Sequence, residues 1–322
     1  LVENYKLSVT HLNNFLNVPK GGPRLFFEQN LLRFPQSKTP SGAYGSAIHS
    51  TLECVLLNLK KAREAASSAV TSSESGAVAG LMPIDEILAE FEKFLKKEKL
   101  HPADFKLFLS RGKAALTAFM AKRADTFKDA DLAEMDFGRE QILVVDPDAD
   151  GYADDGIGHE DRPNKGRAFI TGKIDKVSIS EDELSVHDYK TGRAFESFED
   201  ATGTMAIKGY HYKNQLLFYK LLIEHSAYCR DILFPRLRSK NKVELGVIEF
   251  VEPVGTKKEI HCAELELTDE DADRLKKLAV AVYQRIQALD FEMPAEIAQK
   301  YAKGEYKNDF EAIRDFEEFM LG

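Results

Sequence analysis

The sequence predicts a layered α/β domain, in which helices pack against a sheet, with a helical insertion in its first half. Three observations predict this fold. Apolar residues recur at helical spacing early in the chain, β-rich runs with alternating polarity follow, and a long helical segment separates these runs from further strands. With 322 residues, 43% of them apolar, the chain can bury a substantial core, and we expect one domain over residues 1–322.

The first predicted helix spans residues 45–64. Five apolar residues share one of its faces, namely Ile48, Leu52, Val55, Leu56 and Leu59. A low-complexity stretch of small and polar residues follows at 65–80 and predicts a flexible loop. New helices are predicted from Pro83, since proline is favoured in a first helical turn, and over 104–127. We therefore expect a helical insertion over residues 65–130.

The chain then changes to strands. The predicted strands lie at 141–145, 168–180, 183–190, 243–251 and 259–267. One helix is predicted between the third and fourth of these strands, at 209–225, and a long amphipathic helix follows the last one at 269–289. Short helices are expected to end the chain, so that residues 255–322 form a C-terminal strand with helices.

Composition argues against several classes of protein. Asp and Glu number 53 against 44 Lys and Arg, so the net charge of −9 argues against a simple basic coat on nucleic acid but allows locally basic channels. No apolar run is long enough for a membrane-spanning helix, so we expect no membrane partner. The 3 cysteines are odd in number and far apart, which argues against a disulfide framework and favours a cytoplasmic protein. The chain opens with Leu1, which fits a domain cut from a longer protein.

The strands on either side of residues 181–182 are expected to form an antiparallel hairpin. With a symmetric loop, Ile179 faces Leu184 and Val177 faces Val186. Both are apolar cross-strand pairs, as a buried face requires. The register of the hairpin therefore follows from the sequence.

The same register places Asp175 opposite Asp188, on the face that Lys190 also shares. Two carboxylates directly opposite each other have Cβ atoms about 4.5–5.5 Å apart and repel each other. A divalent cation reverses the sign of that interaction, and hard oxygen ligands suit Mg²⁺ or Mn²⁺. Lys190 could then hold a water or stabilise charge on a phosphate. The alternative is a hairpin whose polar end simply meets solvent.

His49 lies beside the apolar stripe of the first helix, with Glu53 four residues later on the same face. A carboxylate one turn away could orient the imidazole for metal binding. The alternative is a polar helix residue near the surface.

Gln215 and Tyr219 are spaced i, i+4 and project together from the helix at 209–225. Tyr212 and Lys213 precede them in a basic and aromatic stretch, a composition that could grip a phosphate backbone and stack on bases. The alternative is an amphipathic helix with Tyr219 in the core.

Four motifs occur in order along the chain. They are G-S-A-I-H at 45–49, G-K-I-D at 172–175, D-Y-K-T-G at 188–192 and Q-L-L-F-Y at 215–219. In this order they resemble the RecB-like branch of the PD-(D/E)xK nuclease superfamily, and the segment at 7–16 is similar to that branch's N-terminal helix. The resemblance implies a restriction-endonuclease-like core, a sheet flanked by helices in α-β-β-β-α-β order.

The resemblance also implies roles for site residues. The implied ligands of Mg²⁺ or Mn²⁺ are His49, Asp175, Asp188 and the backbone carbonyl of Tyr189. Lys190 is implied as the catalytic lysine, with Gln215 and Tyr219 as active-site residues that position DNA. The implied reaction is metal-dependent hydrolysis of a phosphodiester in DNA, with Asp175 and Asp188 also part of the catalytic set.

Some members of this branch hold an iron–sulfur cluster, but the matching N-terminal position is Val18, and no cysteine follows Cys262. We therefore expect no iron–sulfur cluster. The resemblance implies an exonuclease of DNA recombination and repair with a helicase partner in cis or in trans. Two alternatives stay open, an inactive nuclease-like module that guides DNA or docks proteins, and a metal-binding protein that acts on a small phosphate ester.

Overall fold

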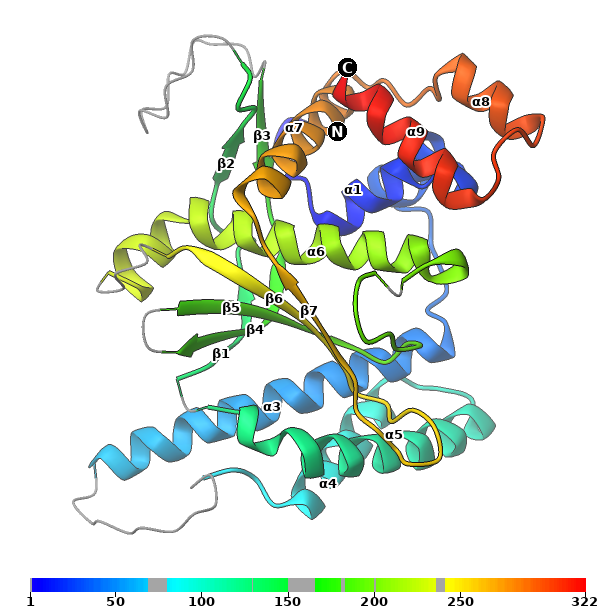
Figure 1. Ribbon diagram of the computed structural model, residues 1–322. Helices are drawn as coiled ribbons and strands as arrows, with labels where there is room; N and C mark the ends of the chain where they lie inside the picture. The colour runs from blue at the N-terminus through cyan, green and yellow to red at the C-terminus, as the bar shows by residue number, and fades with distance from the viewer. Residues whose placement is uncertain are drawn as a thin grey trace.

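A computed structural model (Figure 1) describes residues 2–68, 80–128, 130–149, 166–180, 183–199, 201–235 and 241–322. Its centre is a five-stranded sheet in the order β1-β4-β5-β6-β7. The strands are β1 (Leu132–Asp136), β4 (Lys173–Ser180), β5 (Glu183–Lys190), β6 (Val243–Phe250) and β7 (Cys262–Glu266). Strands β5 and β6 are parallel, and the other neighbours in this sheet are antiparallel.

Helices cover both faces of this sheet (Figure 1). Helix α6 (Ala206–His225) crosses one face, and α3 (Pro40–Ser68) lies on the other with α4 (Ile84–Lys97) and α5 (Pro102–Arg123). Two separate apolar clusters fill these layers, one beneath α6 and one among α3, α4 and α5. The order α3-β1-β4-β5-α6-β6 confirms the predicted α-β-β-β-α-β core.

One of the predicted strands belongs to a different sheet. The run at 141–145 forms β2 (Ile142–Val145), which pairs with β3 (Arg167–Ile170) in a separate two-stranded sheet. The remaining core strand is β1, which the sequence analysis missed. Most of β1 is only half-buried at the edge of the sheet, so its sequence LAEMD lacks the clean alternation of a strand with one buried face.

The predicted strand at 168–180 is two strands. The chain leaves β3 at Ile170 and enters β4 at Lys173, which carries it from the small sheet to the large one. Gly172 lies at this crossing close to α6, because a Cβ there would lie 2.8 Å from Leu222 Cδ1. The continuous β pattern therefore hid a change of sheet.

The hairpin of β4 and β5 has the predicted register. Ile179 pairs with Leu184 and Val177 pairs with Val186. The backbone pairing of β4 with β5 stops at Lys176, so Asp175 lies just outside the paired segment. The apolar pairs thus fix where the acidic residues of both strands lie.

The predicted helices are present in the described residues, but several of their ends differ from the prediction by a few residues. The first helix continues to Ser68, so the predicted loop at 65–80 is wrong for its first residues, and residues 69–79 lie outside the described part. The long C-terminal helix α7 (Asp269–Gln287) and the shorter α8 (Ala295–Ala302) and α9 (Asp309–Leu321) follow β7 as predicted. Helix α1 (Val9–Leu16) packs beside α6, α7 and α9 at the top of Figure 1. The other short helical elements are η1 (Val18–Lys20), α2 (Gly22–Phe26), η2 (Phe27–Leu31), η3 (Ala124–Thr126), η4 (Gly203–Met205) and η5 (Cys229–Leu233).

A glycine lets α6 approach the sheet closely. A Cβ on Gly246 of β6 would lie 2.9 Å from the Cβ and Cδ1 of Leu216, closer than real Cβ contacts allow. Because Leu216 follows Gln215 directly, this contact sets the height of α6 over β5 at the candidate site. In the described part of the chain, every helix is too short or too polar to cross a membrane.

We predict that His211 makes the fold sensitive to acid. Burial, assisted by the charge of Lys20, lowers the pKa of His211 to about 4, and its Nε2 has no hydrogen-bond partner among the described residues. The neutral ring is favoured in the fold, so its contribution is complete above the unfolded pKa of about 6.5 and is lost as pH falls towards 4. In urea unfolding between pH 7.5 and pH 4, His211→Leu should reduce the pH slope by up to about 1.4 kcal/mol per pH unit.

The matched control removes buried side-chain volume without removing a titrating group. Leu12→Ala should lower the unfolding free energy but leave its pH slope at the parent value. An unchanged slope in His211→Leu would show that His211 carries no such linkage.

Candidate active site

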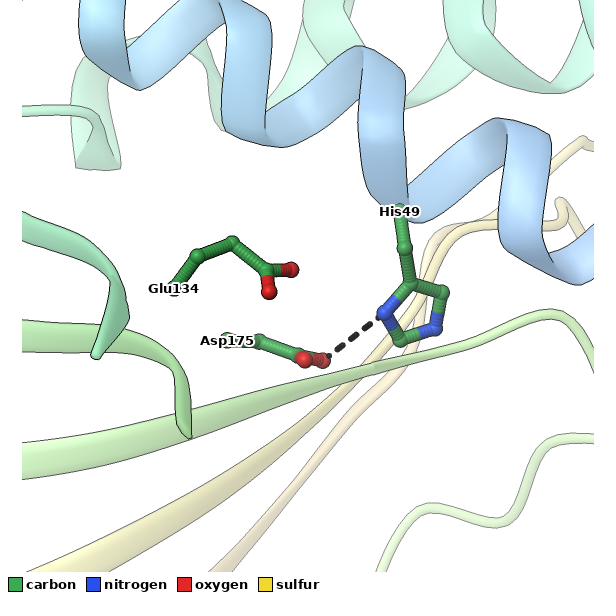
Figure 2. Close-up of side chains that lie close together, drawn as sticks. All are labelled: His49, Glu134 and Asp175. Atoms are coloured by element: carbon green, nitrogen blue, oxygen red, sulfur yellow. Dashed lines mark ion pairs between the residues drawn. The ribbon is translucent and has the colours of Figure 1, made fainter. Parts of the chain in front are cut away.

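The first part of the site joins α3 to β4. Helix α3 brings His49 to the edge of the sheet, where its Nδ1 lies 3.1 Å from Asp175 Oδ2 (Figure 2). The backbone N–H of Tyr189 on β5 donates to the same oxygen at 2.9 Å. The predicted pairing of His49 with Glu53 is wrong, because Asp175 holds the imidazole while Glu53 lines the recess beside it.

Glu134 of β1 completes this part of the site, and the sequence analysis did not find it. One ligand atom each of His49, Glu134 and Asp175 lies within 4.8 Å of the others (Figure 2). The paired residues on either side put Glu134 opposite Asp175 across β1 and β4, and Lys173 forms an ion pair with Glu134. The signal that could have identified Glu134 is a carboxylate placed opposite the predicted metal ligand Asp175. That signal can be used only once β1 is known to be a strand.

The second part of the site joins β5 to α6. Asp188 is 1% exposed, and its Oδ1 accepts hydrogen bonds from Gln215 Nε2 at 2.7 Å and from the Tyr219 hydroxyl at 3.0 Å. Lys190 Nζ lies 2.7 Å from Asp188 Oδ2 and donates to Gln215 Oε1 at 2.9 Å. Gln215 also donates to the Tyr219 hydroxyl at 2.8 Å. The fold thus brings these four predicted residues into one hydrogen-bonded group.

The two carboxylates on β4 and β5 have different surroundings. Burial raises the pKa of Asp188, and the charge of Asp175 adds to the rise, while Lys190 opposes it. Burial also acts on Asp175, but the contact with His49 and the N–H of Tyr189 outweigh it and lower the pKa of Asp175. Burial opposes the charge on Lys190 as well, yet Asp188 keeps the pKa of Lys190 above its ordinary value. Each acid is therefore balanced by a base at this end of the sheet.

The donor atoms suit a divalent cation. His49, Glu134 and Asp175 line an open recess of about 470 Å³, together with Glu53 and Lys173. Beside this group, Asp188 Oδ2 is buried and has no hydrogen-bond donor among the described residues, although the Lys190 ammonium lies close to it. An imidazole with several carboxylate oxygens is a ligand set that Mg²⁺ and Mn²⁺ accept. The residues present therefore fit the metal that the sequence predicts.

Two of the predicted DNA-binding residues lie in different places. The ring of Tyr212 lies 4.9 Å from Lys190 Nζ, next to the group around Asp188. Lys213 does not join this group, because its ammonium forms an ion pair of 2.8 Å with Asp271 of α7. Lys208 shares the face of Tyr212, and both side chains reach the space beside Gly192, the last residue of the D-Y-K-T-G motif.

His49 and Tyr189 also meet through their rings, whose centroids are 6.4 Å apart in an edge-on arrangement. The carbonyl of Tyr189 stays a prediction as a ligand, since its N–H is the group that contacts Asp175. The arrangement therefore combines cation ligands, a buried lysine and a hydrogen-bonding helix face, which is what charge stabilisation on a phosphate requires.

Comparison with known proteins agrees with this chemistry. No curated protein matches the chain significantly. The sequence model of the PD-(D/E)XK nuclease superfamily matches residues 6–298, which include every residue of the site described above. The chain therefore belongs to the PD-(D/E)XK nuclease superfamily.

Proposed function

We propose that this chain is a RecB-like deoxyribonuclease that hydrolyses phosphodiester bonds of DNA with Mg²⁺ or Mn²⁺. The observation that carries the proposal is the hydrogen-bonded group of Asp188, Lys190, Gln215 and Tyr219 next to the His49–Asp175 pair. A domain that only docks partners has no need of a buried lysine and carboxylate beside an open acidic recess.

The proposed cation ligands are His49, Asp175, Asp188 and the backbone carbonyl of Tyr189. Their contacts support the assignment, since Asp175 is oriented by the N–H of Tyr189 and Asp188 is oriented by α6. A divalent cation held by these residues would supply Lewis-acid stabilisation of the charge that develops on a phosphate. The protein's part is to hold the ligands rigidly, which the buried hydrogen bonds to Asp188 do.

Lys190 is the proposed catalytic lysine. Its ammonium is held between Asp188 and Gln215, so its position is fixed before a substrate arrives. A fixed positive charge at that point stabilises negative charge on a reacting phosphate without reorganisation. Gln215 and Tyr219 hold Asp188 from α6 and thereby set the distance between the helix and the reacting groups.

The proposed DNA path runs from the recess along the face of α6 that carries Tyr212 and Lys208. Tyr212 offers a ring for base stacking, and Lys208 offers an ammonium for a phosphate. The Tyr212 hydroxyl and Lys208 Nζ both lie within 4 Å of the position that a Cβ on Gly192 would take, so both side chains border the D-Y-K-T-G motif. Lys213 is left out of this path because Asp271 engages it.

The finer proposal, an exonuclease of recombination and repair that works with a helicase, rests on the order of the four motifs. The net charge of −9 also supports a partner, because an acidic chain binds DNA weakly by itself. A helicase domain or subunit would then supply most of the grip on DNA.

The first test replaces the reacting groups. We expect Asp188→Asn and Lys190→Met to fold as the parent does and to lose at least about 100-fold in Mg²⁺- or Mn²⁺-dependent cleavage of DNA, because each removes charge that the reaction uses. Cleavage of linear and covalently closed circular DNA should be compared, since an exonuclease degrades the linear form alone.

The matched control is Lys242→Met, which breaks an exposed ion pair with Asp269 far from the site and should keep parental activity. A variant of Asp188 or Lys190 that cuts as fast as the parent refutes its assigned role. A parent that binds DNA without cutting it supports the DNA-guiding module instead.

The second test concerns the DNA path. We expect Lys208→Ala to weaken binding of a DNA oligonucleotide and to reduce the salt dependence of log Kd by about 1, as expected for the loss of one phosphate contact. Lys213→Ala on the same helix should change neither quantity. Fluorescence anisotropy at several salt concentrations measures both, and equal effects of the two substitutions would contradict the path.

A further inference from the structure

Glu134 and Lys173 form an ion pair at the edge of the cation site that neither the four motifs nor the family match assigns a role. We propose that Glu134 is an additional carboxylate ligand of the cation, and that Lys173 takes the place of the cation on Glu134 until one binds. Cation binding then frees the Lys173 ammonium for a DNA phosphate. This inference rests on the proposed metal-dependent function and deepens it.

The position of Glu134 supports its role as a ligand. Its carboxylate lies within 4.8 Å of the ligand atoms of both His49 and Asp175, and it comes from a different strand (Figure 2). Only 11% of the Glu134 side chain is exposed, so its orientation is largely set by the fold. Its backbone has a φ of 49°, which is uncommon for a residue other than glycine.

The charges of the recess also call for a cation. Three carboxylates line it, from Glu53, Glu134 and Asp175, against one ammonium, from Lys173. Even if His49 is protonated, three carboxylates face only two positive side chains, so the recess keeps a surplus of negative charge that favours a cation. Just beyond the recess, the buried Asp188 Oδ2 has the Lys190 ammonium 2.7 Å away but accepts no hydrogen bond of good geometry among the described residues, so it can still take a further ligand contact.

Lys173 is suited to be displaced. It opens β4 two residues before Asp175, so both side chains lie on the same face of the strand and line the same recess. Its side chain is 52% exposed, in contrast to that of Glu134. Because the Lys173 side chain is half-exposed, water can solvate its ammonium when a divalent cation takes its place on Glu134. A freed ammonium on a flexible stem at the mouth of the recess can then meet a phosphate.

The ion-pair exchange makes opposite predictions for the two partners. Binding of Mn²⁺ to the full chain without DNA should be measured by titration calorimetry. Glu134→Gln, which keeps the side-chain shape, should weaken Mn²⁺ binding by about tenfold or more. Lys173→Met should strengthen it severalfold, because the competitor is gone. The double variant should bind like Glu134→Gln alone, since Lys173 competes only through Glu134.

The matched control is Glu53→Gln, which removes a negative charge from the same recess. If Glu134 acts as a ligand, Glu53→Gln should have a clearly smaller effect than Glu134→Gln. Equal losses, or a Lys173→Met variant that binds Mn²⁺ no better than the parent, would overturn the proposal.

The freed lysine has its own readout. In a Lys190→Met background, which removes the proposed catalytic lysine, Mn²⁺ should tighten binding of a DNA oligonucleotide in fluorescence anisotropy. Adding Lys173→Met should abolish most of that gain, and an unchanged gain would refute the phosphate contact.

Failure of this inference can be told apart from failure of the proposed function. If Asp175→Asn abolishes Mn²⁺ binding while Glu134→Gln leaves it intact, the cation site stands and only the role of Glu134 is wrong. If the parent itself does not bind Mn²⁺, the metal-dependent function fails together with this inference.

Discussion

Burial of the Asp188 carboxylate beside Asp175 is the constraint on which the site depends. An ionised acid that is 1% exposed is costly unless charge and hydrogen bonds compensate it. Three side chains from two elements surround it, Lys190 from β5 and Gln215 and Tyr219 from α6. The sheet and the helix that covers it must therefore keep a fixed distance, and Gly246 beneath α6 allows that distance to be short.

The opposite face of the same strands carries a second buried charge cluster. Glu249 of β6 lies 2.9 Å from Lys176 of β4 and 2.7 Å from His187 of β5, with Arg123 of α5 at 3.3 Å. Such pairs contribute little net stability, because desolvation offsets most of their attraction. Their geometry is specific, however, and it ties β4, β5 and β6 together in one register. Because side chains alternate along a strand, that register also places Asp188 on the face opposite to that of His187, towards α6.

Much of the core of the site could be predicted because short-range rules determine it. Apolar pairs fixed the hairpin register and hence the places of Asp175 and Asp188, and i, i+4 spacing placed Gln215 with its neighbour on α6. Glu134 could not be predicted, because its edge strand is half-buried and shows no strand pattern. The ion pair of Lys213 with Asp271 of α7 could not be predicted, because α6 is buried over most of its length and its sequence marks no solvent face.

Charge is divided across the site, and this division sets an order of events. The recess between α3 and β1 is acidic, whereas the α6 side presents Lys190 and Lys208. A DNA phosphate is repelled by the recess, because its three carboxylates outnumber the positive side chains that face them and like charges interact strongly where water is partly excluded. A chain with an excess of acid cannot overcome that repulsion with its overall field. Under the proposed function, a cation held by Glu134 and Asp175 would lower this repulsion before DNA reaches the site, so it would assist substrate binding as well as chemistry.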